Sequence, residues 1–166
     1  MRPGRNSERG AAMIEMAIVI PIFLVLVFAI IEFSMAIFTW SRVIESSRAG
    51  ARYAIVSDVE CSGVSGMVCP GSGSVSCALE ADSKILEEMQ KVSATIITEE
   101  NVNISYACSD AGFDERPTPV LHVTVTVSDI EHQFIVPGLF GFDTTMTMPT
   151  HATTRTSEDL YTATED

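Results

Sequence analysis

Residues 10–38 read GAAMIEMAIVIPIFLVLVFAIIEFSMAIF, and this stretch decides how the rest of the chain is interpreted. Between Ala11 and Ile31 the only charged residue is Glu15. At about 1.5 Å per residue, a helix of this length spans about 31 Å, the thickness of one hydrocarbon core. The sequence therefore predicts a single transmembrane helix near the N-terminus.

Polar and aromatic residues mark the outer end of this span. Glu32 falls near the outer headgroups, where a carboxylate can meet water. Phe33 and Trp40 follow at about the depth where aromatic side chains gather at membrane interfaces. Pro21 removes one helical hydrogen bond inside the span, which transmembrane helices tolerate.

The charge of the chain limits its partners. The formal net charge is −12, and after Tyr53 only four basic residues stand against eighteen acidic ones. Nucleic-acid binding requires a basic surface, so this composition argues against a nucleic-acid partner. It fits an acidic outer domain that stays solvated through self-repulsion.

The orientation of the span depends on the cysteines. Three arginines precede the span and three follow it, so the positive-inside rule gives nearly a tie. The first three of the four cysteines are spaced C-x7-C-x7-C, which favours disulfides in an oxidising compartment over a zinc site, the alternative. We therefore expect a cytoplasmic N-terminus and a C-terminal domain outside the cytoplasm. The cysteines are Cys61, Cys69, Cys77 and Cys108.

A cleaved secretory signal peptide is the simpler alternative for the N-terminus. It requires an apolar core of about 7–15 residues and a nearby small-x-small cleavage site. The apolar run here is longer, and the clear A-x-A sequence, residues 49–51, lies far downstream. The pattern therefore favours a retained anchor.

A short basic leader ending in Gly10, followed by small residues, Glu15 and an apolar helix, is the arrangement of type IV prepilins. With the IIEF step at residues 30–33 and ESSRAGARYAIV at residues 45–56, the segment resembles the TadE-like family, pilin-related proteins of tight-adherence (Tad) pilus systems. The resemblance is specific over roughly the first 56 residues. It implies a minor pilin or pseudopilin that acts structurally in assembly of an adhesive pilus and its secretion machine. The resemblance also implies a single-pass protein of the inner (cytoplasmic) membrane with a periplasmic C-terminal domain.

The resemblance also implies cleavage after Gly10 by a prepilin peptidase, which would make Ala11 the new N-terminus. Glu15 then lies about one helical turn from the new amino group, and in a helical bundle it can pair with the amine of a neighbouring subunit. The implied partners are the lipid bilayer, the prepilin peptidase, other pilins and Tad assembly proteins, in a hetero-oligomeric assembly. The alternative is an unprocessed, signal-anchored receptor or adhesin, with Glu15 a headgroup-level charge.

The helix is expected to continue beyond the membrane to about Val56. Ile44, Ala51 and Ile55 recur near helical spacing, and Glu45 and Arg48 are placed to pair along one face. The predicted organisation is a leader at residues 1–10, a transmembrane helix with an amphipathic extension at 11–56, and a disulfide-bonded domain at 57–166.

The outer domain is predicted to be a small pilin-like α+β head. The Gly- and Ser-rich residues 61–77 indicate a loop, and residues 78–98 carry apolar residues at helical spacing. Alternation then predicts about three antiparallel strands, with Pro149 suggesting an edge or a bulge in the third. The strands are expected at residues 102–106, 120–127 and 145–154.

This layout favours one pairing of the cysteines. A helix rising from Cys77 and a strand returning to Cys108 would bring those two residues to the same side of the domain. The favoured disulfides are therefore Cys77–Cys108 and Cys61–Cys69, although four cysteines allow three connectivities.

No catalytic or cofactor motif stands out. The chain lacks a Gly-x-Ser-x-Gly elbow, a phosphate loop and a His-Glu-x-x-His motif, and its histidines (His122, His132 and His151) are scattered. We therefore expect no metal, no cofactor and no enzymatic activity. The apolar run at residues 135–142 either covers the core beneath the sheet or contacts a partner.

Overall fold

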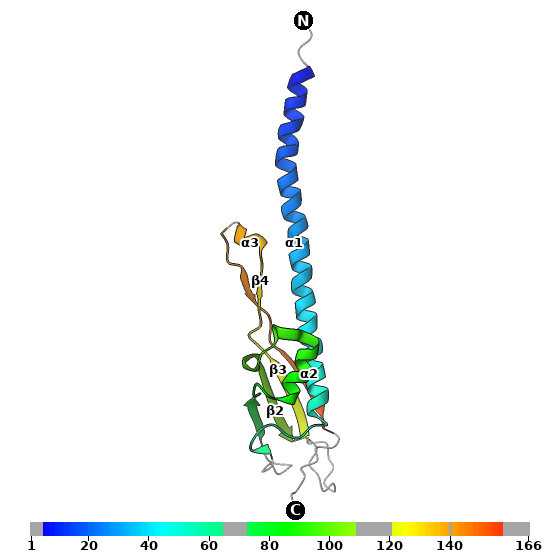
Figure 1. The fold of residues 1–166 in the computed structure, drawn as a ribbon, viewed down its shortest axis with the longest axis vertical. Helices are drawn as coiled ribbons and strands as arrows, with labels where there is room; N and C mark the ends of the chain where they lie inside the picture. Colours follow the sequence, from blue (N-terminus) through cyan, green and yellow to red (C-terminus); the bar gives the residue numbers. More distant parts are fainter. Residues whose placement is uncertain (1–4, 65–72, 109–120, 140, 158–166) are drawn as a thin grey trace, which may run out of the picture. The chain divides into compact units, whose positions relative to one another are not determined.

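The computed structural model describes residues 5–64, 73–108, 121–139 and 141–157 (Figure 1). Helix α1 runs without a break over Arg5–Ala54, with Pro21 inside it. The chain divides into two units, one formed by residues up to Phe38 with His132–Met146, the other by Thr39–Glu131 with the residues from Thr147. The architecture is α+β with one long N-terminal helix, as predicted.

The first unit consists of the apolar part of α1 and a hairpin. Strands β4 (Glu131–Gln133) and β5 (Thr145–Thr147) form a two-stranded sheet, and the short helix α3 (Val136–Leu139) lies between them in the chain. The Phe134 amide donates to the Thr144 carbonyl at 2.6 Å, which extends the pairing toward the tip.

The second unit packs helices on one antiparallel sheet. The sheet order is β1-β2-β3-β6, built from β1 (Ser74–Ala78), β2 (Val102–Cys108), β3 (Leu121–Val127) and β6 (His151–Thr156). Alternate residues of β2 and β3 are buried, as expected for a sheet with one covered face. The amphipathic helix α2 (Lys84–Ser93) adds Ile85, Leu86 and Met89 to the core.

The outer part of α1 also contributes to this core, mainly through small side chains. Val43, Ala51 and Ala54 are buried, and so are Ser46 and Ser47. A Cβ atom placed on Gly50 would lie 2.6 Å from both Cγ and Sδ of Met89. Close packing of α1 on α2 therefore depends on the absence of a side chain at residue 50.

The second helix is shorter than the sequence predicts. The Ser83 side chain accepts a hydrogen bond from the Leu86 amide at 3.1 Å, which fixes the start of α2. Ala94, at a positive φ of 54°, ends it. The 3-10 turn Ala94–Ile96 lies where the last turns of the helix were expected, and a second 3-10 turn, Glu99–Asn101, follows the expected range.

Two strand predictions need correction. Ser74–Ala78, expected to be part of a loop, is the edge strand β1, because it pairs along the whole of its length with β2. The expected third strand is divided into β5 and β6, with Pro149 between them. Proline lacks the N–H that a continuous ladder requires, so the pairing changes at this point.

The favoured disulfide pairing is wrong. Cys61 bonds to Cys77, with their Cα atoms 5.8 Å apart. Cys108 is also disulfide-bonded, and Cys69 lies outside the described residues. The prediction failed because Cys77 lies in an antiparallel strand instead of beginning a helix. It stands opposite Ile104, four residues or about 13 Å along β2 from Cys108.

Candidate assembly site on the long helix

The N-terminal part of α1 presents apolar side chains on every side. Large hydrophobic residues from Met13 to Phe38 are exposed, most of them by about half or more of their surface. By length and composition, α1 is the one helix of the described residues that is able to cross a membrane, with the candidate span given as Gly10–Ala54. The long apolar N-terminal helix that the sequence predicts is therefore present.

The expected processing residues lie on this exposed surface. Gly10 is inside α1 rather than at its start, and no atom lies within 4 Å of the position where its Cβ would be. Ala11 and Glu15 are exposed and four residues apart, so they share one helix face. Within the described part of the chain, no hydrogen bond or ion pair reaches the Glu15 carboxylate.

Glu32, expected at the membrane boundary, has partners in the hairpin. Its Oε1 atom accepts a hydrogen bond from the backbone N–H of Ile135, and another from that of Val136 at 2.8 Å. Phe33, the next residue, is 64% exposed. The carboxylate therefore satisfies two backbone donors at the start of α3, a contact that the sequence analysis did not anticipate.

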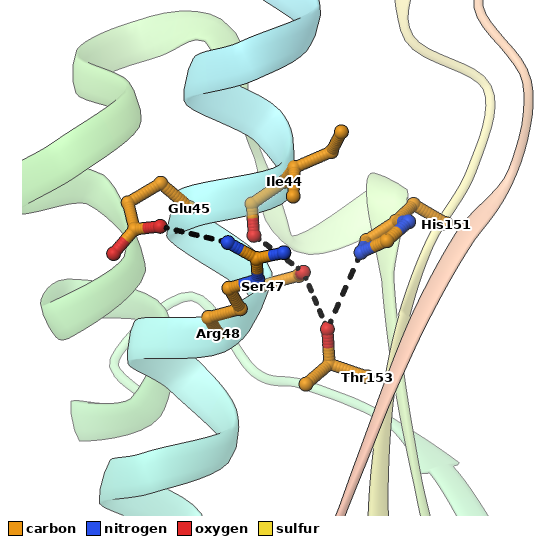
Figure 2. A network of polar contacts seen from close by, with 6 residues as sticks. All are labelled: Ile44, Glu45, Ser47, Arg48, His151 and Thr153. Atoms are coloured by element: carbon orange, nitrogen blue, oxygen red, sulfur yellow. Dashed lines mark hydrogen bonds and ion pairs between the residues drawn. The ribbon is translucent and has the colours of Figure 1, made fainter.

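Trp40 and the following turns of α1 belong to the other unit and contact β6. The Trp40 ring meets His151 edge to face, with 6.0 Å between the ring centroids. Figure 2 shows Ser47 facing Thr153, with their hydroxyl oxygens 2.9 Å apart. The Thr153 hydroxyl oxygen in turn lies 3.4 Å from Nε2 of His151. Ser47 is fully buried, so this network fastens the helix to the sheet.

Charged and polar residues of α1 also satisfy the end of α2. Arg42 donates to the Val92 carbonyl from Nε at 3.1 Å and from Nη2 at 2.9 Å, and Ser46 donates to the Met89 carbonyl at 2.8 Å. The last carbonyls of a helix lack intrahelical partners, and a cation there interacts favourably with the helix dipole. Arg48 pairs with Glu45 at 3.5 Å as expected (Figure 2).

The histidines take part in local contacts. His122 Nδ1 lies 3.2 Å from the Thr156 hydroxyl, and the His132 ring packs edge to face on Phe134. Among residues 5–64, 73–108, 121–139 and 141–157, no group of three His, Cys, Asp or Glu side chains is placed to hold a metal.

The sequence analysis found one feature of α1 in part and missed another. The buried stripe of small residues repeats every three to four positions from Val43 to Ala54. The expected helical spacing included Ala51 of this stripe but not Ser46 and Ser47. The contact between Glu32 and the hairpin joins residues about a hundred positions apart and leaves no local pattern.

The comparison with protein families gives one match. Residues 10–52 match the family described as TadE-like protein, which confirms the resemblance over this segment. Neither the curated proteins nor the solved structures contain a match to the chain. The matched segment includes Gly10, Glu15 and the helix that enters the core.

Proposed function

Because residues 10–52 match the TadE-like family, we propose that this protein is a membrane-anchored minor pilin or pseudopilin of a Tad-type pilus system. It works structurally, in the assembly of an adhesive pilus and its secretion machine. The helix α1 anchors it in the inner membrane with the N-terminus in the cytoplasm. A prepilin peptidase removes the leader after Gly10, and other pilins and Tad assembly proteins are its partners.

One observation supports this proposal beyond the family match. Glu15 is exposed on an apolar helix and has no hydrogen bond or ion pair within the described residues. A carboxylate in hydrocarbon costs about 3 kcal/mol or more and usually has a partner. Among the residues that the structure describes, Glu15 has no such partner, so we propose that a second subunit supplies it.

Cleavage would create a matching group. A chain that starts at Ala11 carries a positive amino group at the end of α1, next to backbone N–H groups that already make the helix N-terminus positive. Glu15 lies one turn away on the same face. Pairing of the amine of one subunit with Glu15 of its neighbour neutralises both charges in apolar surroundings and sets the register of the bundle.

The first test is the mature N-terminus. Mass spectrometry of protein taken from native membranes is expected to find chains that start at Ala11, and a Gly10→Ala variant is expected to keep its leader. Ala29→Gly makes the reverse exchange at another exposed position of α1 and should leave cleavage unchanged. Wild-type chains that retain Met1 or Arg2 would refute processing and favour the unprocessed receptor or adhesin.

The second test separates cleavage from assembly. Glu15→Gln is nearly isosteric and should still be cleaved, but it should be depleted from cross-linked complexes with other pilins. Glu45→Gln makes the same change on the same helix outside the apolar segment and should keep normal complexes. Equal cross-linking of the two variants would refute a role for Glu15 in assembly.

A further inference from the structure

The tip of the β4–β5 hairpin is apolar and uncovered. From Gln133 to Met146 the only acidic or basic residue is Asp143. Ile135 is 74% exposed and Phe142 is 71% exposed. These side chains therefore do not cover the core beneath the sheet, which was one of the two interpretations of the sequence.

Several backbone N–H groups of the tip donate hydrogen bonds to acceptors within the protein. The amides of Ile135 and Val136 donate to Glu32, and Pro137 has no N–H to satisfy. On the other side of the tip, the Gly141 amide donates to the Gly138 carbonyl at 3.2 Å, and the Phe142 amide donates to the Pro137 carbonyl at 3.1 Å. A loop in water does not need internal hydrogen bonds for its backbone N–H groups, because water can accept them, whereas a segment in a lipid environment does.

The position of the tip along α1 is also defined, because Glu32 and the hairpin belong to the same unit. Glu32 follows an apolar span of about 31 Å that begins at Ala11. Its depth is therefore that of the outer membrane interface if the span crosses the bilayer. The exposed apolar tip lies at the same level, because its Ile135 and Val136 amides bond to Glu32.

We infer that the hairpin tip is a second membrane contact, which inserts Ile135 and Phe142 into the outer interface beside the transmembrane helix. Aromatic and aliphatic side chains are favoured at this depth, and the bonds to Glu32 remove two backbone donors that would otherwise oppose insertion. Because the tip carries no basic residue, insertion does not depend on anionic lipids. The inference rests on α1 crossing a bilayer, not on leader cleavage or pilus entry.

Depth-dependent fluorescence quenching tests this contact in the full chain. Trp40 is the only tryptophan, so a Trp40→Phe background allows single tryptophans to be placed elsewhere. The variants are Phe142→Trp at the tip, Leu26→Trp within the anchor, and Val56→Trp as a control that is 70% exposed and apolar but outside the hairpin. Each is reconstituted in phosphatidylcholine vesicles that contain lipids brominated at shallow or deep acyl positions.

The expected result is shallow quenching and a blue-shifted emission for Phe142→Trp, deep quenching for Leu26→Trp, and little quenching for Val56→Trp. Replacing part of the phosphatidylcholine with anionic lipid should not change the pattern. Quenching of Leu26→Trp without quenching of Phe142→Trp would overturn the hairpin contact and leave the anchor intact. A Phe142→Trp side chain that is water-exposed in vesicles but shielded in assembled pilus complexes would also overturn it, and would assign the tip to a protein partner. Failure at Leu26 would overturn both the anchor and the contact.

Discussion

Gly50 offers the sharpest test of how α1 packs in the second unit. An added methyl group would lie 2.6 Å from Cγ and Sδ of Met89 and 3.6 Å from Cγ2 of Ile85. Met89 is fully buried, so its side chain cannot move into solvent to make room. Gly50→Ala should therefore destabilise the head, even though alanine is the better helix former.

The magnitude follows from two opposing contributions. Overpacking a filled core costs about 1–3 kcal/mol, and replacing glycine with alanine inside a helix stabilises by about 1 kcal/mol. We expect Gly50→Ala to lower the free energy of unfolding by about 1 kcal/mol. In a Met89→Ala background the clash is absent, so the same substitution should raise the free energy of unfolding by about 1 kcal/mol. The coupling between the two sites is then about 2 kcal/mol.

Guanidinium unfolding of the full chain in detergent micelles measures these values. Trp40 is the only tryptophan and packs edge to face against His151 in the same unit, so its fluorescence reports loss of this packing. Gly73→Ala is the matched control, because a Cβ there has open space and the change should be within about 0.5 kcal/mol. A Gly50→Ala protein more stable than wild type, or a zero coupling, would show that the contact with Met89 does not limit the packing.

Three further predictions concern other parts of the chain. Glu32→Ala should speed hydrogen exchange of the Val136 amide by about tenfold or more, because hydrogen bonds to charged groups contribute about 1.5–3 kcal/mol. An unchanged exchange rate would show that this hydrogen bond is not populated. Burial raises the pKa of Tyr106 from 10.0 to about 12, so the phenol loses its proton at a lower pH in the unfolded chain than in the folded one. The free energy of unfolding should therefore fall by at most about 3 kcal/mol as the pH rises from 10 to about 12. Tyr106→Phe should remove that part of the pH dependence, and an unaltered pH profile would contradict the assignment. Replacing both Cys61 and Cys77 with serine removes the disulfide between them, which closes a loop of 16 residues. The double substitution should lower the free energy of unfolding by roughly 3 kcal/mol in the same guanidinium assay.

Periodic patterns predicted much of the fold. Three predictions rested on local signals and are confirmed. They are the long apolar helix, the TadE-like resemblance of the N-terminal segment and the alternating burial in β2 and β3. The amphipathic spacing of Leu86 and Met89 likewise located α2, although Ser83 and Ala94 make it shorter than expected.

The errors arose where pairing is non-local. Ser74–Ala78 lacks strongly β-forming residues apart from Val75, and it is a strand because β2 lies beside it. Once that strand was missed, the expected position of Cys77 was wrong and so was the disulfide. The processing and assembly roles of Gly10 and Glu15 remain predictions from the family resemblance, since they depend on a peptidase and on neighbouring subunits.

The bond between Ser47 and Thr153 has a consequence for the order in which the protein is made. It joins the first helix of the chain to its last described strand, 106 residues later. During synthesis, the face of α1 that carries Ser47 must therefore wait for its partner until nearly the whole chain has left the ribosome. The head cannot complete its fold segment by segment from the N-terminus, and contacts of such sequence separation are slow to form. A chain released shortly before residue 150 would contain all of α1, but its sheet would lack the edge strand β6.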